Sequence, residues 1–137
     1  MSLVVDASVA LPWFIEGPDA KRADALVRSR EPLIAPEFVI AEMTNAAWTA
    51  TMFHGLPQQE ATDIVREATR FFSELVPSAS LNYKNRALAI ALELRNPVYD
   101  CFYLALAEAR NLTVVTADAR LLRRCASSQF ASGVRAL

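Results

Sequence analysis

Four acidic residues of this 137-residue chain stand among apolar neighbours, where a carboxylate needs a compensating partner. Asp6 directly follows a short apolar run that is typical of a buried strand, and Asp118 follows a second such run. Glu42 lies within the apolar stripe of a predicted helix, and Asp100 interrupts a helix that is apolar nearly all round. Most other acids have polar neighbours, so these four are the candidates for chemistry.

A shared site for the four acids requires protonation or a bound cation. Two carboxylates repel each other by roughly 4 kcal/mol at about 4 Å and an effective dielectric near 20, so protonation or a bound cation must compensate them. No arginine or lysine is near Asp6, Glu42 or Asp100 in sequence. Mg²⁺ or Mn²⁺ takes oxygen ligands, lowers the pKa of bound water and can direct that water to phosphorus. The four acids therefore predict a divalent metal site.

Three polar side chains near these acids are candidates for hydrogen bonds that hold the ligands in place. Ser8 and Asn45 follow Asp6 and Glu42 by two and three residues, and Thr116 ends the apolar run before Asp118.

Each acid also has an ordinary structural alternative. Asp118 is well placed to cap the helix that follows it, and Asp6 to stabilise an Asx-type turn. Glu42 is a solvated acid if its helix faces another way, and Asp100 stabilises a helix N-terminus by ~0.3–1 kcal/mol. Four such coincidences together are less expected than one acidic site.

Alternating strands and helices are predicted to position the acids. Predicted strands cover residues 3–5, 33–35, 112–116 and 134–137, with an ambiguous one at 76–81. Predicted helices cover residues 19–28, 36–53, 57–75, 82–95, 97–110 and 118–124. Pro36 and Pro97 are expected at the first positions of their helices, and Asn96 at the N-cap of the second. The alternation predicts a parallel sheet with helices on both faces, where ligands bind at the carboxyl ends of strands.

Composition excludes several classes of function. The 14 basic and 15 acidic residues nearly cancel, so no uniform basic surface for nucleic acid is expected. Three glycines are too few and too scattered for a phosphate-binding or dinucleotide loop, and no organic cofactor is expected. One histidine and two cysteines do not make a structural zinc site, and the cysteines are expected to be reduced core residues.

Hydropathy predicts a cytoplasmic protein with no membrane partner, because no apolar stretch approaches the ~18 residues of a membrane span. With no linker or repeat, residues 1–137 are expected to form a single domain.

Four motifs, in order and over nearly the whole chain, resemble the PIN domain, specifically the VapC-like ribonuclease toxins of bacterial toxin–antitoxin pairs. They are Val5-Asp6-Ala7-Ser8, Ile40-Ala41-Glu42, the stretch from Tyr99-Asp100-Cys101 to Ala107, and Val115-Thr116-Ala117-Asp118-Ala119-Arg120-Leu121. The resemblance implies a three-layer α/β/α sandwich around a short parallel sheet. It also implies Mg²⁺ or Mn²⁺ held chiefly by Asp6 and Asp100, with Glu42 and Asp118 completing the site directly or through water. Residues 57–81 match no motif.

The activity that this implies is metal-dependent hydrolysis of RNA phosphodiester bonds by an endoribonuclease. A carboxylate must accept the proton, and Glu42 is the candidate for positioning the water. Arg120 and Arg124 share one face of the predicted helix after Asp118 and are candidates for RNA phosphate contacts, with a solvated helix face as the alternative.

The resemblance also implies a cognate antitoxin and a homodimer. Large apolar side chains on neighbouring predicted helices suit such interfaces, although they also suit the core; they are Trp48, Met52, Phe53, Phe71 and Phe72.

Three alternatives to an RNA-cleaving toxin remain. A catalytically silent PIN-fold module that binds proteins would keep the same fold, although all four acids are present. A phosphatase with Asp6 as nucleophile is disfavoured, because position 8 is serine rather than the aspartate of a DxD motif. Cleavage of single-stranded DNA is harder to separate, since carboxylate and metal chemistry does not need a 2′-hydroxyl.

Overall fold

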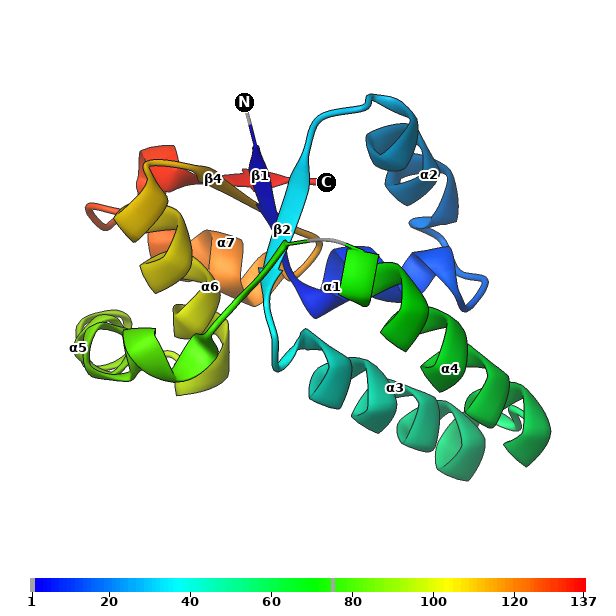
Figure 1. The fold of residues 1–137 in the computed structure, drawn as a ribbon. Helices are drawn as coiled ribbons and strands as arrows, with labels where there is room; N and C mark the ends of the chain where they lie inside the picture. The colour runs from blue at the N-terminus through cyan, green and yellow to red at the C-terminus, as the bar shows by residue number, and fades with distance from the viewer. Residues whose placement is uncertain (1, 75) are drawn as a thin grey trace.

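Five short parallel strands form the central sheet of the computed structural model, which describes residues 2–74 and 76–137 (Figure 1). The strands are β1 (Leu3–Val5), β2 (Leu33–Pro36), β3 (Val76–Ser78), β4 (Thr113–Thr116) and β5 (Val134–Ala136). Their order is β3-β2-β1-β4-β5. The chain thus winds outward from β1 in one direction and then returns to its other side with β4. The carboxyl ends of β1 and β4 flank the point where α/β sheets place ligands.

Helices lie on both sides of these strands, which confirms the predicted α/β sandwich (Figure 1). In Figure 1, α5 and α6 lie to the left of β1 and β2, and the first four helices lie to the right. α6 packs against β1, β2 and β4, whereas α3 and α4 pack against each other. The helices are α1 (Ala7–Ala10), α2 (Ala20–Arg28), α3 (Val39–His54), α4 (Gln58–Glu74), α5 (Lys84–Leu94), α6 (Val98–Arg110) and α7 (Ala119–Ala126), with 3₁₀ turns at Leu11–Trp13, Ser80–Tyr83 and Ala131–Gly133.

The central strands are buried because their side chains are apolar on both faces. All three residues of β1 are buried, and so are Val114 and Val115 of β4. Helices cover both faces of a parallel sheet, so its strands read as continuous apolar runs rather than as alternating ones. The largest fully buried side chains include Tyr103 of α6 and Met43 of α3.

Two predicted helix starts are wrong. Pro36 is the last residue of β2, and α3 begins at Val39. A proline without an N–H is tolerated where a strand's hydrogen bonding ends, so the residue suits either element. The N-cap of α6 is Pro97, with extended backbone angles, rather than the predicted Asn96. The Asn96 side chain instead binds within the candidate site described below.

The other element boundaries agree with the predictions to within a few residues. The ambiguous strand exists as β3, and Leu75, the last residue of the predicted helix before it, lies outside the described residues. The single turn of α1 was not predicted, because four residues are too few to show a helical repeat. Cys101 and Cys125 are buried and free, as expected. Within residues 2–74 and 76–137, no helix is long and apolar enough to span a membrane.

Candidate active site

Asp6 is held at the carboxyl end of β1 by three hydrogen bonds and is 5% exposed. Ser8 Oγ and the Val9 amide donate to its Oδ1 at 2.5 and 3.2 Å, and Thr116 Oγ1 donates to its Oδ2 at 2.5 Å. The Val9 bond makes Asp6 the N-cap of α1. These hydrogen bonds fix the orientation of the buried carboxylate.

Ser8 and Thr116 join the ends of β1 and β4. Ser8 Oγ accepts a hydrogen bond of 2.9 Å from the Ala117 amide, and Thr116 Oγ1 accepts one of 3.0 Å from the Asp118 amide. The two hydroxyl oxygens are 3.3 Å apart. Both residues were predicted to support the acids by hydrogen bonding, and the structure places both on Asp6.

Glu42 is half-buried in the first turn of α3 and is in contact with Tyr103 of α6. The Tyr103 hydroxyl donates to Glu42 Oε1 at 2.9 Å. Tyr103 is fully buried, and sequence reasoning did not select it because tyrosines in apolar helices usually fill cores. Asn45, the other predicted support, is exposed and lines the groove described below.

Asp100 is half-buried in the first turn of α6 and is bound by the residue four positions before it. Asn96 Nδ2 donates to Asp100 Oδ2 at 2.8 Å, while the buried Asn96 Oδ1 has no hydrogen-bond partner among the described residues. Asn96 is itself buried. Asn96 lies four residues before Asp100, and this spacing could have indicated a contact between them. The sequence instead favoured Asn96 as a helix cap.

Asp118 caps α7, as its structural alternative predicted. Its Oδ1 accepts from the Arg120 amide at 2.8 Å and from the Leu121 amide at 3.3 Å. Its negative charge also raises the pKa of Asp100. Capping and proximity to the other acids are therefore combined in one carboxylate.

Burial is the main cause of the raised pKa values in this cluster. Burial raises the pKa of Asp6 from 3.8 to about 6, although its three hydrogen bonds act in the opposite direction. Burial raises the pKa of Glu42 from 4.5 to about 7, opposed by the Tyr103 hydrogen bond. The pKa of Asp100 is raised by burial and lowered by Asn96 and by the positive charge of Arg120.

Mutual repulsion links the acids. The charge of Asp100 raises the pKa of both Asp6 and Glu42, and the charge of Asp6 raises that of Glu42. Asp6, Glu42 and Asp100 are thus three carboxylates that bind protons more readily than usual. Either protons or a hard cation can relieve this repulsion.

The side chains as placed do not by themselves form a metal cage. Within the described part of the chain, no group of three or more His, Cys, Asp or Glu residues is positioned to hold a metal ion. Mg²⁺ usually keeps several waters and takes one or two carboxylates, so this arrangement suits a hydrated ion better than a closed site.

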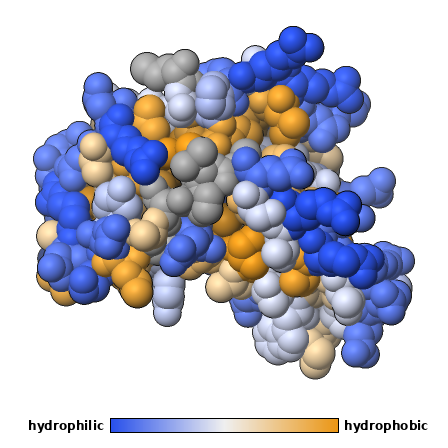
Figure 2. Space-filling view, viewed as in Figure 1, coloured by the Kyte–Doolittle hydropathy of each residue, from blue (hydrophilic) through white to orange (hydrophobic). Residues whose placement is uncertain are grey.

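A large groove runs along the acids. Its volume is about 1920 Å³, and it is lined mostly by apolar side chains from α1, α3 and the start of α6. Ser8, Glu42, Asn45 and Asp100 form part of its wall. Figure 2 shows apolar side chains exposed in the hollow between the α5 and α3 sides of the molecule. The acids therefore border a surface wide enough for a polymer.

The large apolar side chains predicted to suit an interface divide into two groups. Trp48, Met52 and Phe53 of α3 are 55%, 59% and 68% exposed. Phe72 of α4 is buried and Phe71 is partly buried, and both pack against Trp13 with ring centroids 6.4 and 5.1 Å from it. These two residues therefore belong to the core rather than to a surface.

Of the two predicted phosphate contacts, Arg124 has a structural role. Its Nη1 donates to the Leu94 and Arg95 carbonyls at 3.1 and 2.5 Å, which satisfies the C-terminal end of α5. Arg120 is exposed, and its charge reaches Asp100.

Comparisons with known proteins agree with this geometry. The model of the PIN domain family matches residues 3–126. The chain is 28% identical over 124 residues to Ribonuclease VapC3 of Pyrobaculum aerophilum, covering 90% of this chain and 95% of that protein.

Two solved structures share the fold. A toxin–antitoxin complex from Klebsiella pneumoniae has a TM-score of 0.69 at 16% identity, covering 97% of this chain and 95% of that one. VapBC2 from Rickettsia felis, bound to a DNA fragment from their promoter, has a TM-score of 0.64 at 14% identity, covering 100% and 99%. At these identities the likeness concerns the fold alone.

Proposed function

The chain belongs to the PIN domain family, and from this premise we propose that it is a metal-dependent endoribonuclease, the toxin of a toxin–antitoxin pair. The observation that carries the proposal is the cluster of Asp6, Glu42 and Asp100, with raised pKa values, beside a groove. The likeness to a protein named as a ribonuclease and to a toxin–antitoxin complex supports the substrate and the biological role.

Asp6 and Asp100 are the proposed ligands of Mg²⁺ or Mn²⁺, with Glu42 and Asp118 completing the site directly or through water. The donor chemistry fits: all four groups are carboxylates, and the buried Asn96 Oδ1 beside Asp100 lacks a partner among the described residues. When bound, the ion would supply a water of lowered pKa and neutralise charge on a phosphodiester oxygen.

The chain's own residues are proposed to transfer the proton and to hold the acids in position. Glu42 accepts the proton of the attacking water, and a pKa of about 7 lets it exchange protons near neutral pH. Tyr103 fixes the orientation of Glu42, and Asn96 fixes that of Asp100. Ser8 and Thr116 hold Asp6 so that its carboxylate stays directed toward the others. Phosphodiester cleavage by in-line attack needs this kind of fixed geometry.

Two protein partners are proposed. A cognate antitoxin would cover the apolar groove beside the acids, and its binding would block access of RNA to Glu42 and Asp100. A second copy of the chain would cover the exposed α3 side chains Trp48, Met52 and Phe53. A soluble monomer rarely exposes this many large apolar side chains on one helix. A cytoplasmic location is proposed with these roles, since RNA is the substrate.

The test is cleavage of a mixed RNA pool by purified protein that has been separated from any co-purified antitoxin. Cleavage with Mn²⁺ or Mg²⁺ that is lost with EDTA and in Asp100→Asn is the expected result. Asp24→Asn, at an exposed position of α2 that does not line the groove, is the matched control and should cleave normally.

Failure to cleave any RNA would favour the catalytically silent binding module. Titration with Mn²⁺ by calorimetry then separates this module from a nuclease whose substrate was missing from the pool. An intact metal site gives heat that disappears in Asp6→Asn and Asp100→Asn, whereas a silent module gives no such difference.

A further inference from the structure

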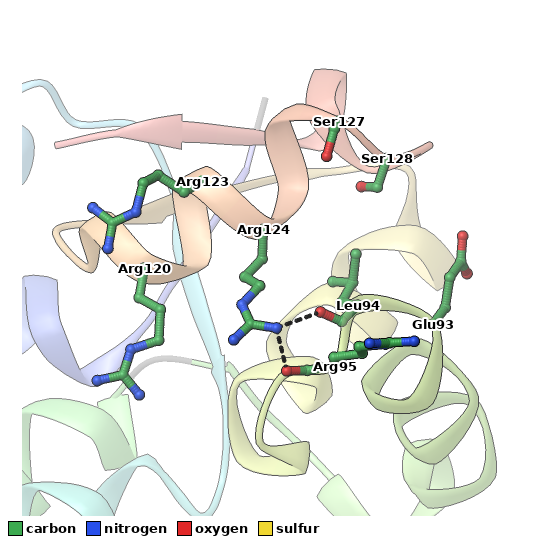
Figure 3. Close-up of a pocket in the computed structure, with 8 residues that line it drawn as sticks. All are labelled: Glu93, Leu94, Arg95, Arg120, Arg123, Arg124, Ser127 and Ser128. Atoms are coloured by element: carbon green, nitrogen blue, oxygen red, sulfur yellow. Dashed lines mark hydrogen bonds between the residues drawn. The ribbon is translucent and has the colours of Figure 1, made fainter.

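A second cavity, of about 610 Å³, lies between α7 and the C-terminal end of α5 (Figure 3). Arg120, Arg123 and Arg124 extend from α7, and Arg95 projects from the segment that follows α5. The remaining lining residues are Glu93, Leu94, Ser127 and Ser128. Arginine therefore supplies half of the residues that line this cavity.

The residues that line this cavity carry more positive than negative charge. Four of the lining residues are arginines and one is an acid, on a chain whose net charge is −1. Both Glu93 carboxylate oxygens accept hydrogen bonds from Gln129 Nε2, at 3.0 and 2.9 Å. Within residues 2–74 and 76–137, none of the four arginines is in a salt bridge. Like charges gathered in a hollow attract an anion.

One of these guanidinium groups is held in place before any ligand arrives. Arg124 donates through Nη1 to the Leu94 and Arg95 carbonyls, and these two bonds use one of its three side-chain nitrogens. The other nitrogens keep donors for a ligand, and anchoring reduces the entropy lost on binding. These two hydrogen bonds keep Arg124 of α7 directed at the C-terminal end of α5.

The cavity adjoins the acidic cluster. Arg120 lines the cavity, and its positive charge lowers the pKa of Asp100. Asp118 is the N-cap of the same α7 that carries three of the arginines. A polyanion that meets the acids therefore meets guanidinium groups next to them on the same helix.

We propose that the arginine cavity binds a phosphate group of the RNA strand whose neighbouring bond is presented to the acids. The proposal rests on the proposed function, because it takes the substrate to be RNA. A cluster of carboxylates repels a polyanion, so a cationic site beside it is needed to hold the strand in register. Guanidinium groups suit phosphate because they donate paired hydrogen bonds and keep their charge. Such contacts position a strand without reading its sequence.

The test is binding of a fluorescently labelled single-stranded RNA, measured by anisotropy in EDTA so that no cleavage occurs. Arg120→Ala and Arg123→Ala leave the anchor at Arg124 intact. Each should weaken binding several-fold and the pair by about tenfold or more, and each should reduce the slope of log affinity against log salt by ~0.7. Arg28→Ala, which removes an exposed arginine from the last turn of α2, is the control and should leave both quantities unchanged.

Unchanged affinity and salt slope in the double variant would overturn the proposal, as would an equal loss in Arg28→Ala. RNAs that carry a 5′-phosphate or a 5′-hydroxyl distinguish the source of the phosphate. Equal sensitivity of both RNAs to Arg120→Ala and Arg123→Ala assigns the cavity to a backbone phosphodiester, and sensitivity of the 5′-phosphorylated RNA alone assigns it to a terminal phosphate.

The two proposals fail separately, because the binding readout does not depend on cleavage. A protein that binds RNA through these arginines but never cleaves it keeps the cavity and loses the nuclease. A protein that cleaves RNA with metal, yet binds it equally well without Arg120 and Arg123, keeps the nuclease and loses the cavity.

Discussion

The hydroxyl of Tyr103 donates to Glu42 Oε1 at 2.9 Å, joining two helices that are 61 residues apart in sequence at that contact. Tyr103 is fully buried in α6, and Glu42 faces the groove from α3. One hydrogen bond therefore carries the packing of α6 into the candidate site. It also opposes the effect of burial on the pKa of Glu42, which stands at about 7.

Replacement of Tyr103 by phenylalanine should move the pH dependence of cleavage. The Tyr103 hydrogen bond lowers the pKa of Glu42, so its loss raises that pKa further above the usual range. If ionised Glu42 is the proton acceptor, the acidic limb of the rate profile moves to higher pH. The free energy of unfolding should fall by about 1 kcal/mol. Rates measured across pH check this, with Tyr83→Phe as the control; an unmoved limb would remove Glu42 from that role.

Metal-free protein should become less stable as pH rises. Folding raises the pKa of Asp6 from 3.8 to about 6 and that of Glu42 from 4.5 to about 7, so the native state binds more protons than the unfolded chain between these values. The stability that protonated Asp6 and Glu42 contribute is fully present below their pKa values in the unfolded chain. It is lost as the pH rises through their pKa values in the folded protein.

Thermal unfolding in EDTA measures this dependence. The melting temperature should fall between about pH 4 and about pH 7, and Asp6→Asn should flatten the fall because it removes one titrating group. As the pH rises, the stability of the variant relative to the wild type should increase, because only the wild type must ionise a buried Asp6. A melting temperature that rises with pH over this range would contradict the assigned direction of both pKa shifts.

Asn96 should affect metal binding through its hydrogen bond to Asp100. Its Nδ2 bonds to Asp100 Oδ2 at 2.8 Å, so Asn96→Ala frees the proposed ligand to rotate. Loss of a hydrogen bond that orients a ligand typically weakens metal affinity by about 10- to 100-fold. Calorimetric titration with Mn²⁺ measures the change, and Asn85→Ala on the exposed face of α5 is the matched control. Equal Mn²⁺ affinity in both variants would show that Asp100 needs no such support.

The exposed end of α3 should hold a homodimer together. Trp48 and Phe53 lie 5.8 Å apart between ring centroids and are both more than half exposed. Trp48→Glu with Phe53→Glu should give a monomer by light scattering at micromolar concentration, with unchanged thermal stability of the fold. Leu92→Glu, which alters an equally exposed apolar residue of α5, should remain dimeric. A monomeric wild-type protein would contradict the dimer itself.

Local sequence patterns determined the elements of the fold. The apolar runs at Leu3–Val5 and Thr113–Thr116 and the helical repeat of α2 are properties of neighbouring residues, so they were visible without coordinates. The positions of Asp6 and Asp118 within two residues of the ends of β1 and β4 followed from the same patterns. Parallel topology then placed both at one edge of the sheet, because all strands of such a sheet end on the same side.

Side-chain partners were decided by the tertiary structure. Thr116 reaches Asp6 across 110 residues of sequence, and Arg124 reaches Leu94 across 30. Asn96 was expected to cap its own helix, yet its amide binds Asp100, because backbone angles place Pro97 at the cap. A periodic pattern specifies which face of an element is apolar. Which polar groups meet depends on how elements distant in sequence pack, and only the folded chain brings those atoms within hydrogen-bonding distance.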